Sequence, residues 1–132
     1  AALHHLRGRP DGNGKVGAVG FCWGGGQVNS LAVNTSELDA GVVYYGGQAP
    51  TERVPAIKAP LMFQYAGLDE RINAGIAAYE ATLLASGKTF QSYTYPGVNH
   101  GFNNDTNLAR FNREAADLAW SRTLAFFATH LA

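Results

Sequence analysis

Three residues with reactive side chains stand out, because each follows an apolar run that is typical of a buried strand. Cys22, the only cysteine of the chain, lies in Gly20-Phe21-Cys22-Trp23-Gly24. Asp69 and His100 follow two later runs of the same kind. A cysteine, a histidine and a carboxylate within reach of one another could perform nucleophilic catalysis. The thiolate would attack a carbonyl, the imidazole would carry the proton, and the carboxylate would orient the imidazole.

The segment around Cys22 has the form Gly-x-nucleophile-x-Gly. This pattern is typical of a sharp turn from a strand into a helix that exposes the central side chain. Glycines are needed there because the turn is strained and neighbouring backbones come close. At a helix N-terminus, backbone N–H groups and the helix dipole favour the thiolate. We therefore predict that Cys22 is a nucleophile. The alternative is a buried structural cysteine.

His100 and Asp69 are the predicted general base and orienting carboxylate. The chain order nucleophile, acid, histidine is that of α/β-hydrolases. Each residue also has a simpler interpretation, since His100 could be an exposed loop histidine and Asp69 could cap the helix that follows it. The backbone N–H of Trp23, the residue after the nucleophile, is the predicted oxyanion donor.

Five residues are candidates for substrate binding. Four are aromatic, lie near predicted strand ends and could line a pocket, although they could equally be ordinary core residues: Trp23, Tyr44, Tyr45 and Phe102. Arg71 lies two residues after Asp69 and could hold a substrate carboxylate in a bidentate manner. A solvated loop arginine is the alternative.

Strands and helices are expected to alternate along the chain, which predicts an α/β fold with a mostly parallel sheet. In such a sheet, sites lie beyond the carboxyl ends of the strands, where the three reactive residues fall. A helix end over residues 1–7 precedes the first strand. The expected strands are 15–21, 40–45, 60–66 and 90–95, and the expected helices are 24–33, 73–86 and 112–131. Residues 48–58 are expected to form a polar loop.

Composition limits the possible classes of protein. The chain has 132 residues, enough for one domain, with 46% apolar residues and a net charge of zero. No basic run suggests a nucleic-acid surface, and no apolar segment is long enough to span a membrane. The N-terminus lacks the apolar region of a signal peptide, so we expect a cytoplasmic protein. No residue cluster has zinc-ligand spacing, and we expect neither a metal nor a cofactor.

These motifs resemble the dienelactone hydrolase (carboxymethylenebutenolidase) family. The resemblance rests on the cysteine turn, on Tyr44-Tyr45-Gly46, on Asp69 after a strand, on the segment 95–102 and on the final helix. It implies the α/β-hydrolase fold and a Cys22–His100–Asp69 triad. This triad would hydrolyse a small ester or lactone through an acyl-enzyme, without a cofactor, in the breakdown of aromatic compounds. The position of a substrate-binding arginine in the best-known members is occupied here by Asn104.

The resemblance covers only the C-terminal part of the longer family members. The chain is therefore expected to be a single, N-terminally truncated domain of about four strands, without the strand that supplies the second oxyanion donor. Two expectations follow. The strand before Cys22 becomes an exposed edge that a second copy of the chain could cover. The alternative function is a catalytically silent half-domain that serves as a binding or assembly module.

Overall fold

The computed structural model describes all 132 residues and contains one parallel four-stranded sheet. Its strands are β1 (Gly17–Phe21), β2 (Ala40–Tyr44), β3 (Leu61–Ala66) and β4 (Phe90–Tyr95), and their spatial order is their chain order. Each neighbouring pair is parallel, so the chain crosses back over the sheet after each strand. The predicted α/β fold with a parallel sheet is thus confirmed.

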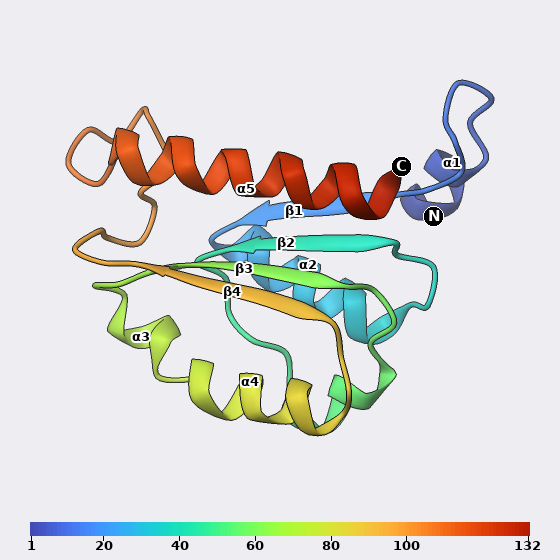
Figure 1. The fold of residues 1–132 in the computed structure, drawn as a ribbon, viewed down its shortest axis with the longest axis horizontal. Coiled ribbons are helices and arrows are strands. Elements are labelled where there is room, and N and C mark those ends of the chain that lie inside the picture. Colours follow the sequence, from blue (N-terminus) through green and yellow to red (C-terminus); the bar gives the residue numbers. More distant parts are fainter.

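Helices cover both faces of the sheet (Figure 1). On one face lie α2 (Trp23–Asn34), α3 (Glu70–Asn73), α4 (Ile76–Ala85) and the short 3-10 helix η1 (Thr51–Ala56). The opposite face is covered by α5 (Arg113–Leu131), while α1 (Ala2–Arg7) lies near the C-terminus of α5.

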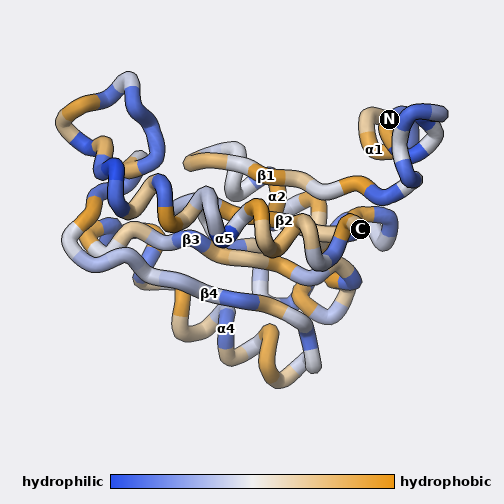
Figure 2. Tube along the Cα trace, turned by 45° about the horizontal axis from the view of Figure 1, so that its top comes forward, coloured by the Kyte–Doolittle hydropathy of each residue, from blue (hydrophilic) through white to orange (hydrophobic).

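The two inner strands, β2 and β3, explain this arrangement, because they carry mainly apolar side chains on both faces of the sheet. Every residue of β2 and β3 is buried, as expected for strands covered on both faces. Val43, Phe63 and Tyr65 pack toward α2 and α4, whereas Val42 and Met62 pack toward α5. The sheet therefore separates two apolar cores. Figure 2 shows a largely hydrophilic segment between β4 and α5.

The largest difference from the sequence prediction concerns the helix expected over 73–86. It begins earlier, at Glu70, and is broken into α3 and α4 at Ala74-Gly75. The side chain of Gln48 causes the break: its Nε2 donates to the Ile72 carbonyl at 3.0 Å, and its Oε1 lies where a Cβ on Gly75 would stand. Residues 48–58, expected to be a loop, also contain η1.

Strand β1 is an edge of the sheet, as expected. Val19 and Phe21 on this strand are each more than a third exposed. Cover of the edge by a second copy of the chain stays a prediction. No helix combines the length and apolar character needed to cross a membrane.

Candidate active site

Cys22 lies on the turn between β1 and α2, in a backbone conformation that few residues adopt. Its φ is 58° and its ψ is −122°, while its own carbonyl accepts from the Gly25 amide at 3.0 Å. The turn is tight enough that a Cβ on Gly20 would lie 2.1 Å from the Gly24 carbonyl oxygen. The glycine at position 20 therefore permits the turn, and the turn leaves the Cys22 side chain exposed.

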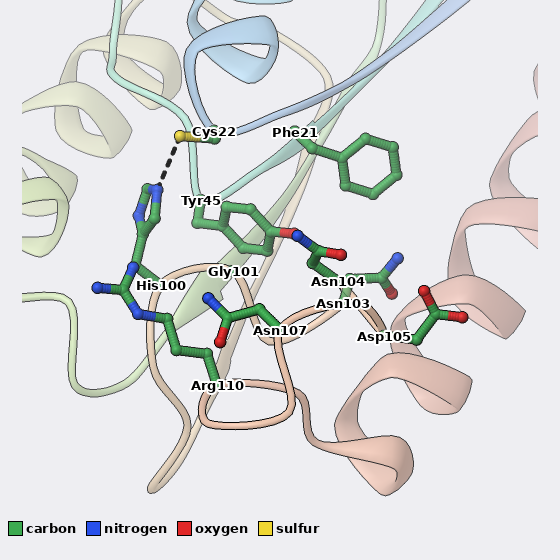
Figure 3. A pocket seen from close by; sticks show the side chains of 10 residues that line it. All are labelled: Phe21, Cys22, Tyr45, His100, Gly101, Asn103, Asn104, Asp105, Asn107 and Arg110. Atoms are coloured by element: carbon green, nitrogen blue, oxygen red, sulfur yellow. Dashed lines mark hydrogen bonds between the residues drawn. The ribbon is translucent and has the colours of Figure 1, made fainter.

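His100 and Asp69 reach Cys22 from the ends of two other strands. His100 Nε2 lies 2.9 Å from Cys22 Sγ, and His100 Nδ1 lies 2.5 Å from Asp69 Oδ2. Asp69 is buried and His100 is partly buried, whereas the thiol is exposed to solvent. The structure thus brings the three predicted reactive residues into one continuous chain of contacts (Figure 3).

Asp69 also caps α3. Its Oδ1 accepts from the Ile72 amide at 3.3 Å, while Oδ2 faces His100. The two interpretations of this residue, orienting carboxylate and helix cap, are therefore compatible, because each uses a different oxygen. The loop is fixed further by a hydrogen bond from the Gly67 amide to the Tyr95 carbonyl at 2.8 Å.

Tyr45 holds the His100 ring in place. The two ring centroids are 5.0 Å apart, and the ring of Phe102 packs edge-on against Tyr45 at 5.3 Å. Tyr45 has a φ of 36°, which turns the chain at the end of β2. Burial raises the pKa of Tyr45 to about 12, against an opposing hydrogen bond to the Asn103 backbone. Its phenol is therefore a neutral group at physiological pH.

A cavity of about 430 Å³ opens beside Cys22 and His100. Most of its wall comes from the segment that follows His100, whose side chains are polar (Figure 3). The lining residues are Phe21, Cys22, Tyr45, His100, Gly101, Asn103, Asn104, Asp105, Asn107 and Arg110.

Two predicted substrate-binding residues do not reach this cavity. Tyr44 and Phe102 are fully buried, and the Tyr44 hydroxyl bonds Thr123 of α5 at 2.7 Å. Tyr44 is the last residue of β2 and packs in the core beneath α5. Tyr45 follows the strand in a backbone conformation with a positive φ, and its side chain lines the cavity.

Trp23 and Arg71, which were also predicted to bind substrate, lie on a different side of Cys22. Trp23 is the first residue of α2, so its N–H has no carbonyl partner within the helix. Its side chain is 77% exposed. Trp23 and Arg71 both line a second cavity, of about 370 Å³, to which Cys22 also contributes.

Tyr45, one of the aromatic residues predicted to line a pocket, does line this cavity. Sequence reasoning missed most of the polar wall formed by the segment 101–110. The asparagines of this segment, immediately after a histidine at a strand end, were an available signal. The choice between the adjacent residues Tyr44 and Tyr45 depends on the backbone turn at Tyr45, which the sequence does not show.

A parallel sheet, a strained cysteine turn after a strand, and an acid and a histidine at later strand ends together define the α/β-hydrolase fold. More specifically, the chain belongs to the dienelactone hydrolase family, whose sequence model matches residues 1–131. This is a family of hydrolases, and the predicted resemblance is confirmed.

Individual relatives agree with this assignment. The chain is 32% identical over 130 residues to a carboxymethylenebutenolidase from Pseudomonas putida, covering 97% of this chain and 54% of that protein. It is 37% identical over 90 residues to the human carboxymethylenebutenolidase homolog, covering 67% of this chain and 37% of that protein. This chain thus spans about half the length of such relatives or less.

Solved structures show the same fold. A dienelactone hydrolase-like promiscuous phosphotriesterase from metagenomic libraries superposes with a TM-score of 0.89 at 21% identity. The match covers all of this chain and 59% of that one. At this identity the likeness establishes the fold alone.

Proposed function

We propose that the chain carries the catalytic residues of a cysteine-dependent hydrolase for a small carboxylic ester or lactone. Cys22 is the nucleophile, His100 the general base and acid, and Asp69 the residue that orients His100. The Trp23 amide is one oxyanion donor. The observation that supports the proposal is the continuous contact from Cys22 Sγ through the imidazole to a buried carboxylate.

The proposed reaction has two halves. In the first, His100 Nε2 takes the thiol proton and Cys22 Sγ attacks the carbonyl carbon. The oxygen that gains negative charge is stabilised by the Trp23 N–H, and His100 then protonates the leaving alcohol as the carbon–oxygen bond breaks. In the second half, His100 activates a water molecule, which releases the acid and restores the thiol.

Asp69 supports both halves of the reaction. By accepting a hydrogen bond from His100 Nδ1–H, it leaves Nε2 free to act as the base toward Cys22. It also stabilises the imidazolium that forms when the thiol is deprotonated. Its burial keeps water from competing for this hydrogen bond.

Hydrolysis of 4-nitrophenyl butyrate by the wild-type chain and by Cys22→Ala tests the proposal. We expect nitrophenol release by the wild type and a loss of at least about a thousandfold in the variant, because no nucleophile remains. Mass spectrometry of the quenched wild-type reaction should show a butyryl adduct on Cys22. Lys58→Gln, a change at an exposed residue outside both cavities, is the control. Equal rates for the wild type and Cys22→Ala would contradict the proposal.

The alternative function, a silent binding or assembly module, has no specific observation in its favour. A silent module has no need to keep a buried carboxylate, a histidine and an exposed thiol in contact. The proposed setting is the cytoplasm and the proposed partner is a small-molecule substrate, without nucleic acid.

A further inference from the structure

The two cavities described above meet at a single residue. Cys22 is the only residue that lines both of them. The first cavity contains His100, and the second contains Trp23 but not His100. A substrate whose carbonyl carbon lies at Cys22 Sγ can therefore extend in two directions.

Proton transfer decides which part of an ester occupies which cavity. His100 Nε2, 2.9 Å from Sγ, must give its proton to the leaving oxygen, so the alcohol part lies on the His100 side, in the first cavity. The developing oxyanion turns toward the Trp23 amide. The acyl chain takes the remaining direction, into the second cavity.

The second cavity is equipped to bind an anion. Its polar side chains are Gln27, Gln48 and Arg71. None of the ion pairs of this chain involves Arg71, so its guanidinium has no carboxylate partner within 4.0 Å. Gln48 is held in position by its hydrogen bond to the Ile72 carbonyl. A guanidinium without a carboxylate partner can bind a carboxylate with two parallel N–H donors.

We infer that the second cavity is the acyl subsite and that Arg71 binds a carboxylate on the acyl chain. The inferred substrate is an open-chain monoester of a dicarboxylic acid. This inference rests on the proposed function of Cys22. Attack by Sγ forms a thioester and breaks the bond to the alcohol, which leaves with the proton from His100. Water then releases the free dicarboxylic acid and the thiol.

Two esters with the same leaving group test the inference. For mono-4-nitrophenyl succinate, Arg71→Gln should lower kcat/KM by roughly 10- to 100-fold, the value of a charge-assisted hydrogen bond. For 4-nitrophenyl butyrate, which has no carboxylate, the same variant should change kcat/KM by less than about twofold. Arg71→Lys should recover part of the loss, and Lys58→Gln should resemble the wild type. An equal loss for both esters, or no loss for the succinate, would overturn the inference.

A second measurement needs no turnover. Succinate should protect Cys22 of the wild type against alkylation by iodoacetamide, and Arg71→Gln should require at least about tenfold more succinate for the same protection. Arg110→Gln removes the same charge from the first cavity and should retain the protection. Loss of protection in Arg110→Gln but not in Arg71→Gln would overturn the inference. If succinate protects Cys22 in an Arg71-dependent manner but neither ester is hydrolysed, the proposed function and the acyl subsite both fail, and only carboxylate binding by Arg71 stands.

Discussion

Asp69 shows how much a single residue contributes to this site. One of its oxygens fixes the His100 ring and the other caps α3. The same short helix carries Arg71, which lines the second cavity. The cap therefore also helps to place a residue of the inferred acyl subsite.

The two roles of Asp69 can be separated by a pair of variants. Asp69→Asn keeps an oxygen for the Ile72 amide but would donate to His100 Nδ1 and impose the wrong tautomer. Asp69→Ala removes both contacts. We expect both variants to lower kcat for 4-nitrophenyl butyrate by roughly a thousandfold or more. Only Asp69→Ala should also lose about 1 kcal/mol of unfolding free energy, measured by urea denaturation.

Each result has a clear contrary outcome. If Asp69→Asn keeps more than a tenth of the activity, the carboxylate does not orient His100. If the two variants are equally destabilised, Oδ1 contributes no cap.

At the scale of elements, the turn between β1 and α2 places Cys22, the proposed nucleophile. Cys22 has a positive φ because the chain must reverse within one residue between strand and helix. The glycines of this turn differ in what surrounds them. A Cβ on Gly20 would meet the Gly24 carbonyl oxygen at 2.1 Å, whereas a Cβ on Gly24 would meet nothing within 4 Å.

These surroundings predict opposite effects for two similar variants. Gly20→Ala should lower the unfolding free energy by about 3 kcal/mol and slow the alkylation of Cys22 by iodoacetamide, because backbone must move. Gly24→Ala, within α2, should leave the alkylation rate unchanged and add up to about 1 kcal/mol of stability. Thermal and urea denaturation measure the stabilities. If Gly20→Ala is as stable as the wild type, the turn is looser than its geometry indicates.

At the scale of the whole molecule, tyrosines contribute to both cores. Tyr44 and Tyr95 lie on the α5 side, and Tyr65 and Tyr79 lie on the side of α2 and α4. Burial raises the pKa of Tyr44 and of Tyr79 to about 12, and it also raises the pKa of Tyr65 and Tyr95. The folded state thus prefers the neutral phenol at each of these four positions.

This preference predicts loss of stability in alkali. Below pH 10 the phenols are protonated in both states, and their contribution is fully present. Between pH 10 and about 12 the unfolded chain releases protons that the folded chain retains, so the free energy of unfolding falls. The slope is about 1.4 kcal/mol per pH unit for each such tyrosine. Urea denaturation from pH 8 to 11.5 measures the free energy of unfolding. Phenolate absorbance at 295 nm measures the ionisation of the tyrosines. A constant stability up to pH 11.5 would contradict the prediction.

The order of strands and helices could be read from the sequence because it depends on local patterns. The run 40–45 is apolar throughout, and 60–66 is apolar except for Gln64, as expected for strands buried on both faces. The break between α3 and α4 could not be read in this way. It depends on Gln48, which is distant in sequence and enters the space beside Gly75.

For the site, the sequence by itself determined the three residues that meet, because each lies at a strand end and parallel strands end at one edge. Only the tertiary structure decided which side chains surround them. Tyr45 rather than Tyr44 faces His100, because the backbone turns at Tyr45, which has a φ of 36°, directly after the end of β2. Arg71 and Arg110 line different cavities, because Arg71 lies on α3 whereas Arg110 lies in the segment between β4 and α5. Residue types and spacing therefore specify the proposed chemistry, whereas packing between distant segments specifies what the site can bind.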